Sequence, residues 1–153
     1  MNDSRSLSVR TATFGAIEVP EEKVLHFEEG VPGFPQLRRF AVLELEDLKP
    51  FSYLQSLDDP PIAFLVVSPF LFQPSYRFEL GEADARSLQA QKLEDVSVLV
   101  VATIPENASD ATINLMAPVL INEKCRCGRQ VILLDSHYPV RYPLFSADTG
   151  AIG

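Results

Sequence analysis

The stretch VSVLVVATI, residues 96–104, decides the fold class of this chain. It is rich in β-branched residues and carries apolar side chains at both odd and even positions, so neither face of a strand built from it is polar. A short, continuous apolar run of this kind is typical of a central strand that is buried on both faces. We therefore expect a β-protein with Val98 and Val100 in its core.

Shorter apolar runs lie on both sides of this stretch, and turn residues separate them. They lack the 3.6-residue spacing of an amphipathic helix, so they favour strands. We expect strands at residues 8–14, 16–19, 39–45, 51–57, 62–68 and 76–80, a short apolar piece at 24–27, and a long hairpin formed by residues 111–122 and 130–135. Residues 82–90 are good helix formers without proline and predict one short helix. The expected fold class is all-β, a small barrel-like antiparallel sheet fold, closed as a barrel or a sandwich, with one short helix.

The alternation of side chains along a strand predicts which residues form the core. Residues two positions apart share one face of a strand. The core residues expected on this basis are Phe64, Val66, Val98, Val100, Ile113, Leu115, Ile132 and Leu134. Three polar residues are embedded in the apolar strands, and we expect them to be buried amides that satisfy backbone groups. They are Asn114, Asn122 and Gln130.

The chain is acidic, with 21 Asp and Glu against 13 Lys and Arg and a net charge of −8. Residues 17–95 contain 15 of these acids and 7 of the bases, so the whole deficit lies there. Nucleic-acid affinity depends mostly on cations that meet phosphates, and we therefore expect no direct nucleic-acid binding. Solubility and a basic protein partner both explain the acidic surplus, and composition alone leaves both open.

Length and apolar runs bound the organisation and location of the chain. Its 153 residues are the size of one domain. The longest apolar runs have about nine residues, whereas a membrane-spanning helix needs about 20, so we expect no membrane association. The first residues, MNDSRSLSVRTATFG, lack the apolar segment of a secretory signal. These features predict a cytoplasmic protein.

The two cysteines fit a reducing compartment. Cys125 and Cys127 are separated by one residue, a spacing at which a disulfide is strained. We therefore expect free thiols whose replacement by serine leaves the fold intact, although the role of the pair stays open.

Three groups of residues have side chains that occur in catalytic or metal sites. Asp135, Ser136 and His137 are the residue types of a hydrolase triad, but neighbours on a strand point in opposite directions. The two cysteines and two histidines lack the spacing of a zinc site. The paired acids lack the spacing of a calcium loop, and no glycine-rich phosphate loop occurs. The sequence therefore predicts a protein that is not an enzyme and has no metal site and no cofactor.

Six sequence blocks, in this order, are more specific than any single motif. They are TATFGAIEV, FEEGVPGFPQLRRFAVLEL, PFSYLQSLDDPPIAFLVVSP, EDVSVLVVATIPE, ATINLMAPVLIN and GRQVILLDSHYPVRYPL. Together they resemble the FliW family of flagellar assembly factors. The resemblance covers residues 9–144, which implies a single barrel domain there. Residues 1–8 and 145–153 fall outside the resemblance, and we expect them to be a flexible amino-terminal tail and a flexible carboxy-terminal tail.

The resemblance also implies a function. Members of the family bind flagellin in the cytoplasm, and after flagellin is exported they bind CsrA, a translational repressor of flagellin messenger RNA, and relieve repression. The implied partners are therefore CsrA and flagellin, and an acidic surface suits the basic surface with which CsrA must bind RNA. The alternative is a small-ligand-binding β-barrel protein, which needs an enclosed cavity with convergent polar groups.

Five acidic residues are the candidate protein-binding residues: Asp58, Asp59, Glu79, Glu82 and Asp84. The first two occupy a turn beside two prolines, and the others surround the start of the expected helix. The helix dipole also favours carboxylates at that start, so a structural explanation competes with the functional one. We expect reversal of both turn aspartates to lysine to slow association with CsrA and to change thermal stability little.

Overall fold

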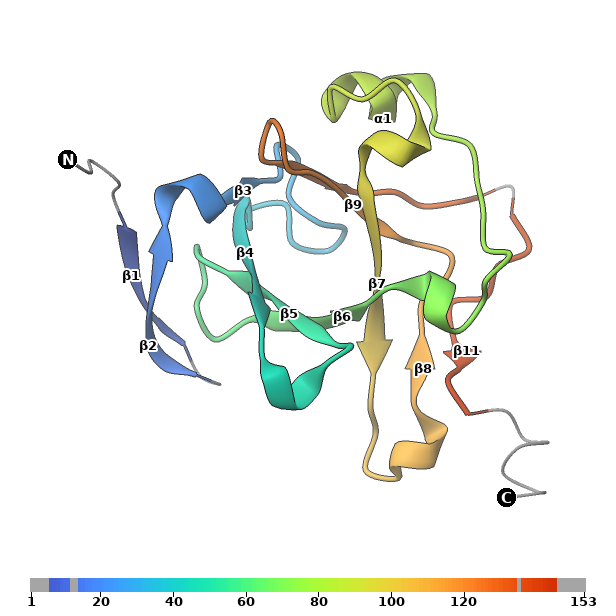
Figure 1. Cartoon of the computed structure of the whole chain (residues 1–153), viewed down its shortest axis with the longest axis horizontal. Coiled ribbons are helices and arrows are strands. Elements are labelled where there is room, and N and C mark those ends of the chain that lie inside the picture. Colours follow the sequence, from blue (N-terminus) through green and yellow to red (C-terminus); the bar gives the residue numbers. More distant parts are fainter. Residues whose placement is uncertain (1–5, 12–13, 135, 146–153) are drawn as a thin grey trace.

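A closed sheet of seven strands forms the body of the molecule (Figure 1). The computed structural model describes residues 6–11, 14–134 and 136–145. The barrel strands are β3 (Leu25–His26), β4 (Arg39–Glu44), β5 (Ser52–Ser56), β6 (Ala63–Val67), β7 (Ser97–Thr103), β9 (Val119–Asn122) and β10 (Cys127–Gln130). They follow the order β7-β6-β5-β4-β3-β10-β9, and pairing of β9 with β7 closes the ring. All of these pairs are antiparallel except β3 with β10.

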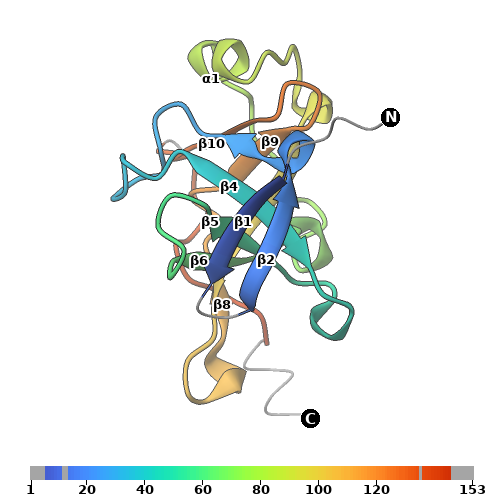
Figure 2. The same ribbon diagram turned by 90° about the vertical axis from the view of Figure 1, so that its left-hand side faces the viewer.

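Smaller elements surround the barrel and complete the predicted all-β class. They are the strands β1 (Ser6–Thr11), β2 (Gly15–Pro20), β8 (Thr112–Ile113) and β11 (Tyr142–Pro143), and the helix α1 (Glu82–Ser87). The described residues also form five short 3₁₀ helices: η1 (Glu21–Lys23), η2 (Glu46–Leu48), η3 (Pro69–Leu71), η4 (Leu93–Asp95) and η5 (Ala108–Asp110). Figure 2 shows the β1–β2 hairpin lying across the barrel wall, where Val9 and Val19 pack against Ala41 and Leu57. The barrel-like fold with one short helix is thus confirmed, and β1 begins at Ser6, inside the segment 1–8 expected as a tail.

The central strand β7 holds the core together as the sequence predicts. Val100 is completely buried and Val98 is 8% exposed, although Ser97 and Thr103 at the ends of the strand reach solvent. Val66, Ile113 and Leu115 are also fully buried, and Phe64 is half-buried against the same interior. These core predictions are confirmed.

The prediction is wrong for two core residues, because Ile132 is 47% exposed and Leu134 is 77% exposed. Their neighbours Val131 and Leu133 pack against the core instead. The amides of Val131 and Leu133 donate to the carbonyls of Pro118 and Met116, and these hydrogen bonds fix the register of residues 131–133 beside residues 116–118. Every position from 131 to 134 is apolar, and such a run does not say which of the two alternating sets faces inward.

The long hairpin expected between residues 111 and 135 is divided into separate strands. Asn114 causes the break, because its Oδ1 accepts the amides of Met116 and Ala117 at 3.0 and 3.1 Å and turns the chain between β8 and β9. Asn122 is 4% exposed and donates to the Leu88 carbonyl at 2.8 Å. Gln130 donates to the Ala117 carbonyl at 3.0 Å. All three amides satisfy backbone groups as predicted, although Asn114 and Gln130 are only partly buried.

Two further elements differ from the sequence-based expectation. Residues 76–80 form no strand; the Tyr76 hydroxyl instead reaches into the core and donates to the Leu115 carbonyl at 2.7 Å. Burial, and then the neighbouring Tyr138, raise the pKa of Tyr76. The helix α1 begins at Glu82 as expected but ends at Ser87, because Gln89 takes a left-handed conformation with φ of 52°.

The two cysteines depart from the prediction of free thiols. The structure joins Cys125 and Cys127 in a disulfide at the tip between β9 and β10, with their Cα atoms 5.3 Å apart. Arg126 between them has φ of 55°, and this left-handed residue turns both cysteine side chains toward one another. The tight turn explains how a pair only two positions apart can meet.

Candidate protein-binding site

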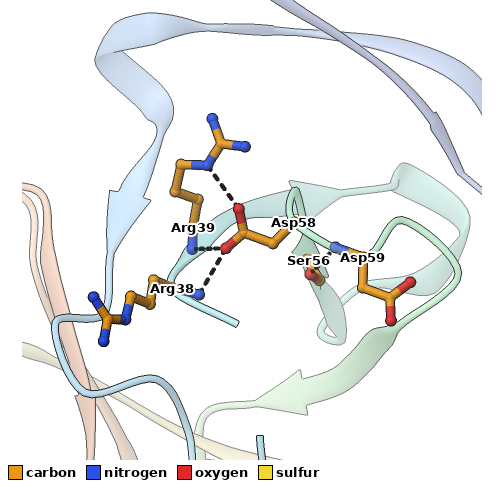
Figure 3. A network of polar contacts seen from close by, with 5 residues as sticks. All are labelled: Arg38, Arg39, Ser56, Asp58 and Asp59. Atoms are coloured by element: carbon orange, nitrogen blue, oxygen red, sulfur yellow. Dashed lines mark hydrogen bonds and ion pairs between the residues drawn. The ribbon is translucent and has the colours of Figure 1, made fainter. Parts of the chain in front are cut away.

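The carboxylate of Asp58, expected to lie free in solvent, is turned back onto the start of β4 (Figure 3). Its Oδ2 accepts the backbone amides of Arg38 and Arg39 at 2.7 and 2.8 Å, and its Oδ1 accepts the Arg39 Nε at 2.9 Å. The Asp58 side chain is only 25% exposed in this position. Asp58 therefore connects the β5–β6 turn to β4.

The register of β4 and β5 explains why these residues meet. Phe40 lies opposite Ser56, and the Leu57 amide donates to the Arg39 carbonyl at 2.8 Å. The next pair outward in this antiparallel register is Arg38 with Asp58. An aspartate at this position therefore finds two backbone amides that are not used by the ladder.

Hydrogen bonds from the side chains of Ser56 and Gln55, at the end of β5, fix the rest of the turn. The Ser56 Oγ accepts the Asp59 amide at 2.9 Å. Gln55 is completely buried, and its Nε2 donates to the Pro60 carbonyl at 2.7 Å and lies 3.2 Å from the Ile62 carbonyl. Because the turn is tied on its inner side, the Asp58 carboxylate is held close to Arg39 without much freedom to rotate away.

The environment of Asp58 stabilises its charged form. Partial burial raises the pKa of this carboxyl, but hydrogen bonds from the Arg38 amide and from the Arg39 side chain and amide outweigh burial. The net result is a pKa held below the ordinary value of 3.8.

The carboxylate of Asp59 behaves differently from that of its neighbour. Figure 3 shows it pointing away from the two arginines, and the residue is exposed. Both residues have exposed surface, but the Asp58 carboxylate is hydrogen-bonded to β4, whereas the Asp59 carboxylate points toward solvent as a docking residue requires.

Asp84 belongs to a second ion-pair cluster, which attaches α1 to the barrel. Its Oδ1 accepts the Arg129 Nε at 2.5 Å, and the same guanidinium pairs with Glu29 at 3.3 Å and lies 3.4 Å from the Ser87 hydroxyl. Asp84 and Arg129 are 20% and 23% exposed. Partial burial lowers the pKa of Arg129, but the hydrogen bond with Asp84 and the charge of Glu29 outweigh it and raise the pKa. Asp84 therefore has a structural role at this corner.

Glu79 and Glu82 are exposed. The Glu82 carboxylate is 92% exposed and pairs with Arg86 one turn along α1 at 3.3 Å, a contact of small energetic value at this exposure. The five candidate residues thus separate into two that hold the fold together, Asp58 and Asp84, and three whose charge faces solvent, Asp59, Glu79 and Glu82.

The candidates lie in two places and do not form one cluster. Figures 1 and 2 both show α1 above the barrel, with the β5–β6 turn at the barrel side. Sequence reasoning missed Arg38 and Arg39, although the hairpin register could have placed them beside Asp58. It also missed Arg129 and Glu29, for which no local pattern gives a signal, since Asp84 and Arg129 are 45 positions apart.

The other chemical candidates show no catalytic arrangement among the residues that the structure describes. Asp135 lies outside the described residues. The Ser136 hydroxyl donates to the Leu133 carbonyl at 2.8 Å and accepts the Tyr138 amide at 3.3 Å, which closes a local turn. Within residues 6–11, 14–134 and 136–145, no three His, Cys, Asp or Glu side chains converge as metal ligands.

In the part of the chain that the structure describes, the best-formed hollow lies at the surface and large apolar side chains pack inside the barrel. One hollow of about 540 Å³ is open to solvent and is lined by Arg77, His137 and Tyr138 with their neighbours. Inside the barrel, Phe27, Phe40 and Leu54 pack together and none is more than 1% exposed. In the described part of the chain, no helix is long and apolar enough to cross a membrane.

These features define a small acidic β-barrel protein with a packed interior, an attached hairpin and helix, and carboxylates at two surface regions. The family model described as FliW protein matches residues 8–144. The flagellar assembly factor FliW of Caldicellulosiruptor saccharolyticus is 43% identical over 137 residues, covering 90% of each chain. That of Bacillus subtilis is 38% identical over 136 residues, covering 89% of this chain and 95% of the relative.

A solved structure agrees with these sequence comparisons. A crystal structure of the flagellar assembly factor FliW superposes with a TM-score of 0.86 at 36% identity, covering 92% of this chain and 98% of the other. The chain belongs to the FliW family of flagellar assembly factors.

Proposed function

We propose that this chain acts in the cytoplasm without catalysis, that it binds flagellin, and that it antagonises CsrA by binding it and so relieves repression of flagellin translation. The observation that carries the proposal is the set of carboxylates that stay exposed after both ion-pair clusters have formed, namely Asp59, Glu79 and Glu82. Membership of the FliW family supports the flagellar context.

The physical basis is charge complementarity with an RNA-binding protein. A protein that binds RNA needs cations that meet phosphates, so it presents a basic surface. Exposed carboxylates on this chain, whose net charge is −8, attract such a surface and repel the phosphates that compete for it. Asp58 and Asp84 contribute less to this attraction, because their charges are already paired with arginines.

The packed interior favours this proposal over a small-ligand-binding barrel. Val66, Val100 and Leu120 are fully buried and fill the space between the strands. A ligand site needs an enclosed cavity of several hundred Å³ with a few convergent polar groups. The packed interior therefore supports functional contacts on the outside of the barrel.

The proposal is tested with single charge reversals that avoid the two structural aspartates. The variants are Asp59→Lys, Glu82→Lys and, as a matched control, Glu106→Lys, which makes the same charge change in the exposed loop between β7 and η5. Association rates with purified CsrA are measured at several salt concentrations. We expect Asp59→Lys and Glu82→Lys to slow association several-fold at low salt and to flatten its salt dependence more than the control does.

The outcomes separate the site from the function. If all three variants slow association equally, the effect comes from net charge and the two regions are not the docking surface. If the unmodified chain retains neither CsrA nor flagellin in a pull-down with purified proteins, the proposed function is wrong.

A further inference from the structure

The cysteine tip, residues 125–127, has chemistry that the proposed function does not use. Cys125 and Cys127 are bridged between β9 and β10, and both residues are partly exposed. The bridge is therefore at the border of the core and partly open to solvent, in contrast to a bridge that is fully enclosed.

The bridge is poorly suited to be a structural staple. In the chain-entropy account, a disulfide stabilises a fold by restricting the unfolded chain, and the effect grows with the length of the loop that it closes. Cys125 and Cys127 are two positions apart, so their bridge closes one of the shortest possible loops. Disulfides that are exposed or strained are also the ones that exchange readily with small thiols. Both arguments favour a bridge that is made and broken.

The residue between the cysteines connects the tip to two other elements. The Arg126 carbonyl accepts the His26 amide of β3 at 2.8 Å, and its Nη1 donates to the Glu21 carbonyl of η1 at 3.1 Å. Arg126 makes both contacts while its backbone is left-handed, with φ of 55°, a conformation that is uncommon for a non-glycine residue and persists where the surroundings enforce it. A bridge from Cys125 to Cys127 supplies such a constraint.

The root of the tip is connected to the helix. Asn122, at the end of β9, donates to the Leu88 carbonyl at 2.8 Å, while its Oδ1 accepts the Lys124 amide at 3.0 Å. The tip therefore lies where β3, η1 and the carboxy-terminal end of α1 meet, and a change in its backbone affects all three.

We propose that Cys125 and Cys127 are a reversible redox modification site whose co-reactant is a low-molecular-weight disulfide of the glutathione type. The thiolate of one cysteine attacks a sulfur of the small disulfide, which forms a mixed disulfide and releases one small thiol. The second cysteine thiolate then attacks the protein sulfur and displaces the second small thiol. Two electrons pass from the cysteine pair to the small disulfide, and the two cysteine protons leave with the two released thiols.

The two redox states differ in how firmly the tip is hydrogen-bonded to β3. In the bridged state Arg126 is held in its left-handed conformation and its carbonyl faces the His26 amide. In the dithiol state the backbone of Arg126 is free to relax, so the hydrogen bond to His26 opens more often. The pairs β4–β5 and β5–β6 are expected to stay unchanged, because neither includes a residue of the tip. This inference does not depend on the identity of the binding partners.

The test measures, in the whole chain, the oxidation state of the two cysteines and the hydrogen bond from the His26 amide to the Arg126 carbonyl. The protein is equilibrated with mixtures of reduced and oxidised glutathione and then alkylated, and mass spectrometry counts the free thiols. Hydrogen exchange is measured in the fully oxidised and fully reduced states. We expect one smooth interconversion between dithiol and bridge, and several-fold faster exchange of the His26 amide in the reduced state. Exchange of the Leu57 amide, which donates to Arg39 in the β4–β5 pair, stays the same.

A double variant, Cys125→Ser with Cys127→Ser, is the control. Its His26 amide is expected to exchange as in the reduced protein, whatever the glutathione mixture. The proposal is overturned if oxidised glutathione leaves both thiols free, if only mixed disulfides accumulate, or if the His26 exchange rate is the same in both states. The last comparison uses the unmodified chain alone, so it decides the matter even if the double variant folds poorly.

Discussion

Two aspartates of this molecule each face an arginine, but they hold different kinds of structure. Asp58 accepts two backbone amides at the start of β4 in addition to the Arg39 side chain, so it belongs to the barrel wall. Asp84 contacts only side chains, and its cluster attaches a six-residue helix to β10. The contribution of an ion pair to the fold therefore depends on whether its carboxylate also accepts backbone amides.

Removal of the Asp58 carboxylate is expected to have the largest effect on stability. We expect Asp58→Ala to lower the free energy of unfolding by about 2–3 kcal/mol, because it leaves two backbone amides without their charged acceptor. Asp59→Ala, one position further and exposed, is the matched control and should stay within about 0.5 kcal/mol of the unmodified chain. Urea denaturation measures both. Equal losses in the two variants would show that the turn as a whole, rather than the Asp58 contact, sets the stability. The sequence-based expectation that reversal at this turn leaves stability nearly unchanged therefore applies to Asp59 only.

Acid should remove the same contribution gradually. The folded pKa of Asp58 is lowered, so the unfolded chain binds a proton at this residue before the folded chain does. The contribution is fully present above the unfolded pKa, near 3.8, and is lost as the pH falls through the folded pKa. The stability difference between the unmodified chain and Asp58→Asn is therefore expected to shrink as the pH falls from 6 to below 3.8. Denaturation curves across this range measure it, and a difference that is independent of pH would contradict the ionised contact. The pKa of Asp95 is lowered too, by the amides of Gln91 and Lys92, and comparing the two proteins cancels its contribution.

The sequence was informative where a local pattern determined the outcome. Residues 96–104 could be recognised as a buried strand because the run is apolar except at Ser97 and Thr103, and β7 covers residues 97–103 of it. The same uniformity misled the prediction for Ile132 and Leu134, since an apolar run has no parity of its own and the pairing with Met116 and Pro118 decides which set faces inward.

The candidate site was predictable to a smaller extent. Exposed turns and a helix start could be found from prolines, aspartates and helix formers, which led to the five acidic residues. Whether each carboxylate is free depends on its neighbours in space. Arg39 could have been found from the β4–β5 register, but the cluster of Glu29, Asp84 and Arg129 joins three segments that no sequence pattern connects.

Removal of the Asp84 charge is expected to have the smallest effect on stability and to act mainly on the helix. Asp84→Asn removes one of the two carboxylates around Arg129, and Glu29 remains to pair with the guanidinium. We expect a loss of about 1 kcal/mol, because the pair is partly buried but uses no backbone amide. The loss should be local: exchange of the Leu88 amide, which donates to the Asp84 carbonyl within the helical turn, becomes faster while amides of β5 and β6 are unchanged. Glu82→Gln, on the exposed face of the same helix, is the matched control and should alter neither quantity, because its pair with Arg86 is open to solvent. If Asp84→Asn instead destabilises the whole barrel as much as Asp58→Ala does, α1 is an integral part of the barrel and the distinction between the two aspartates fails.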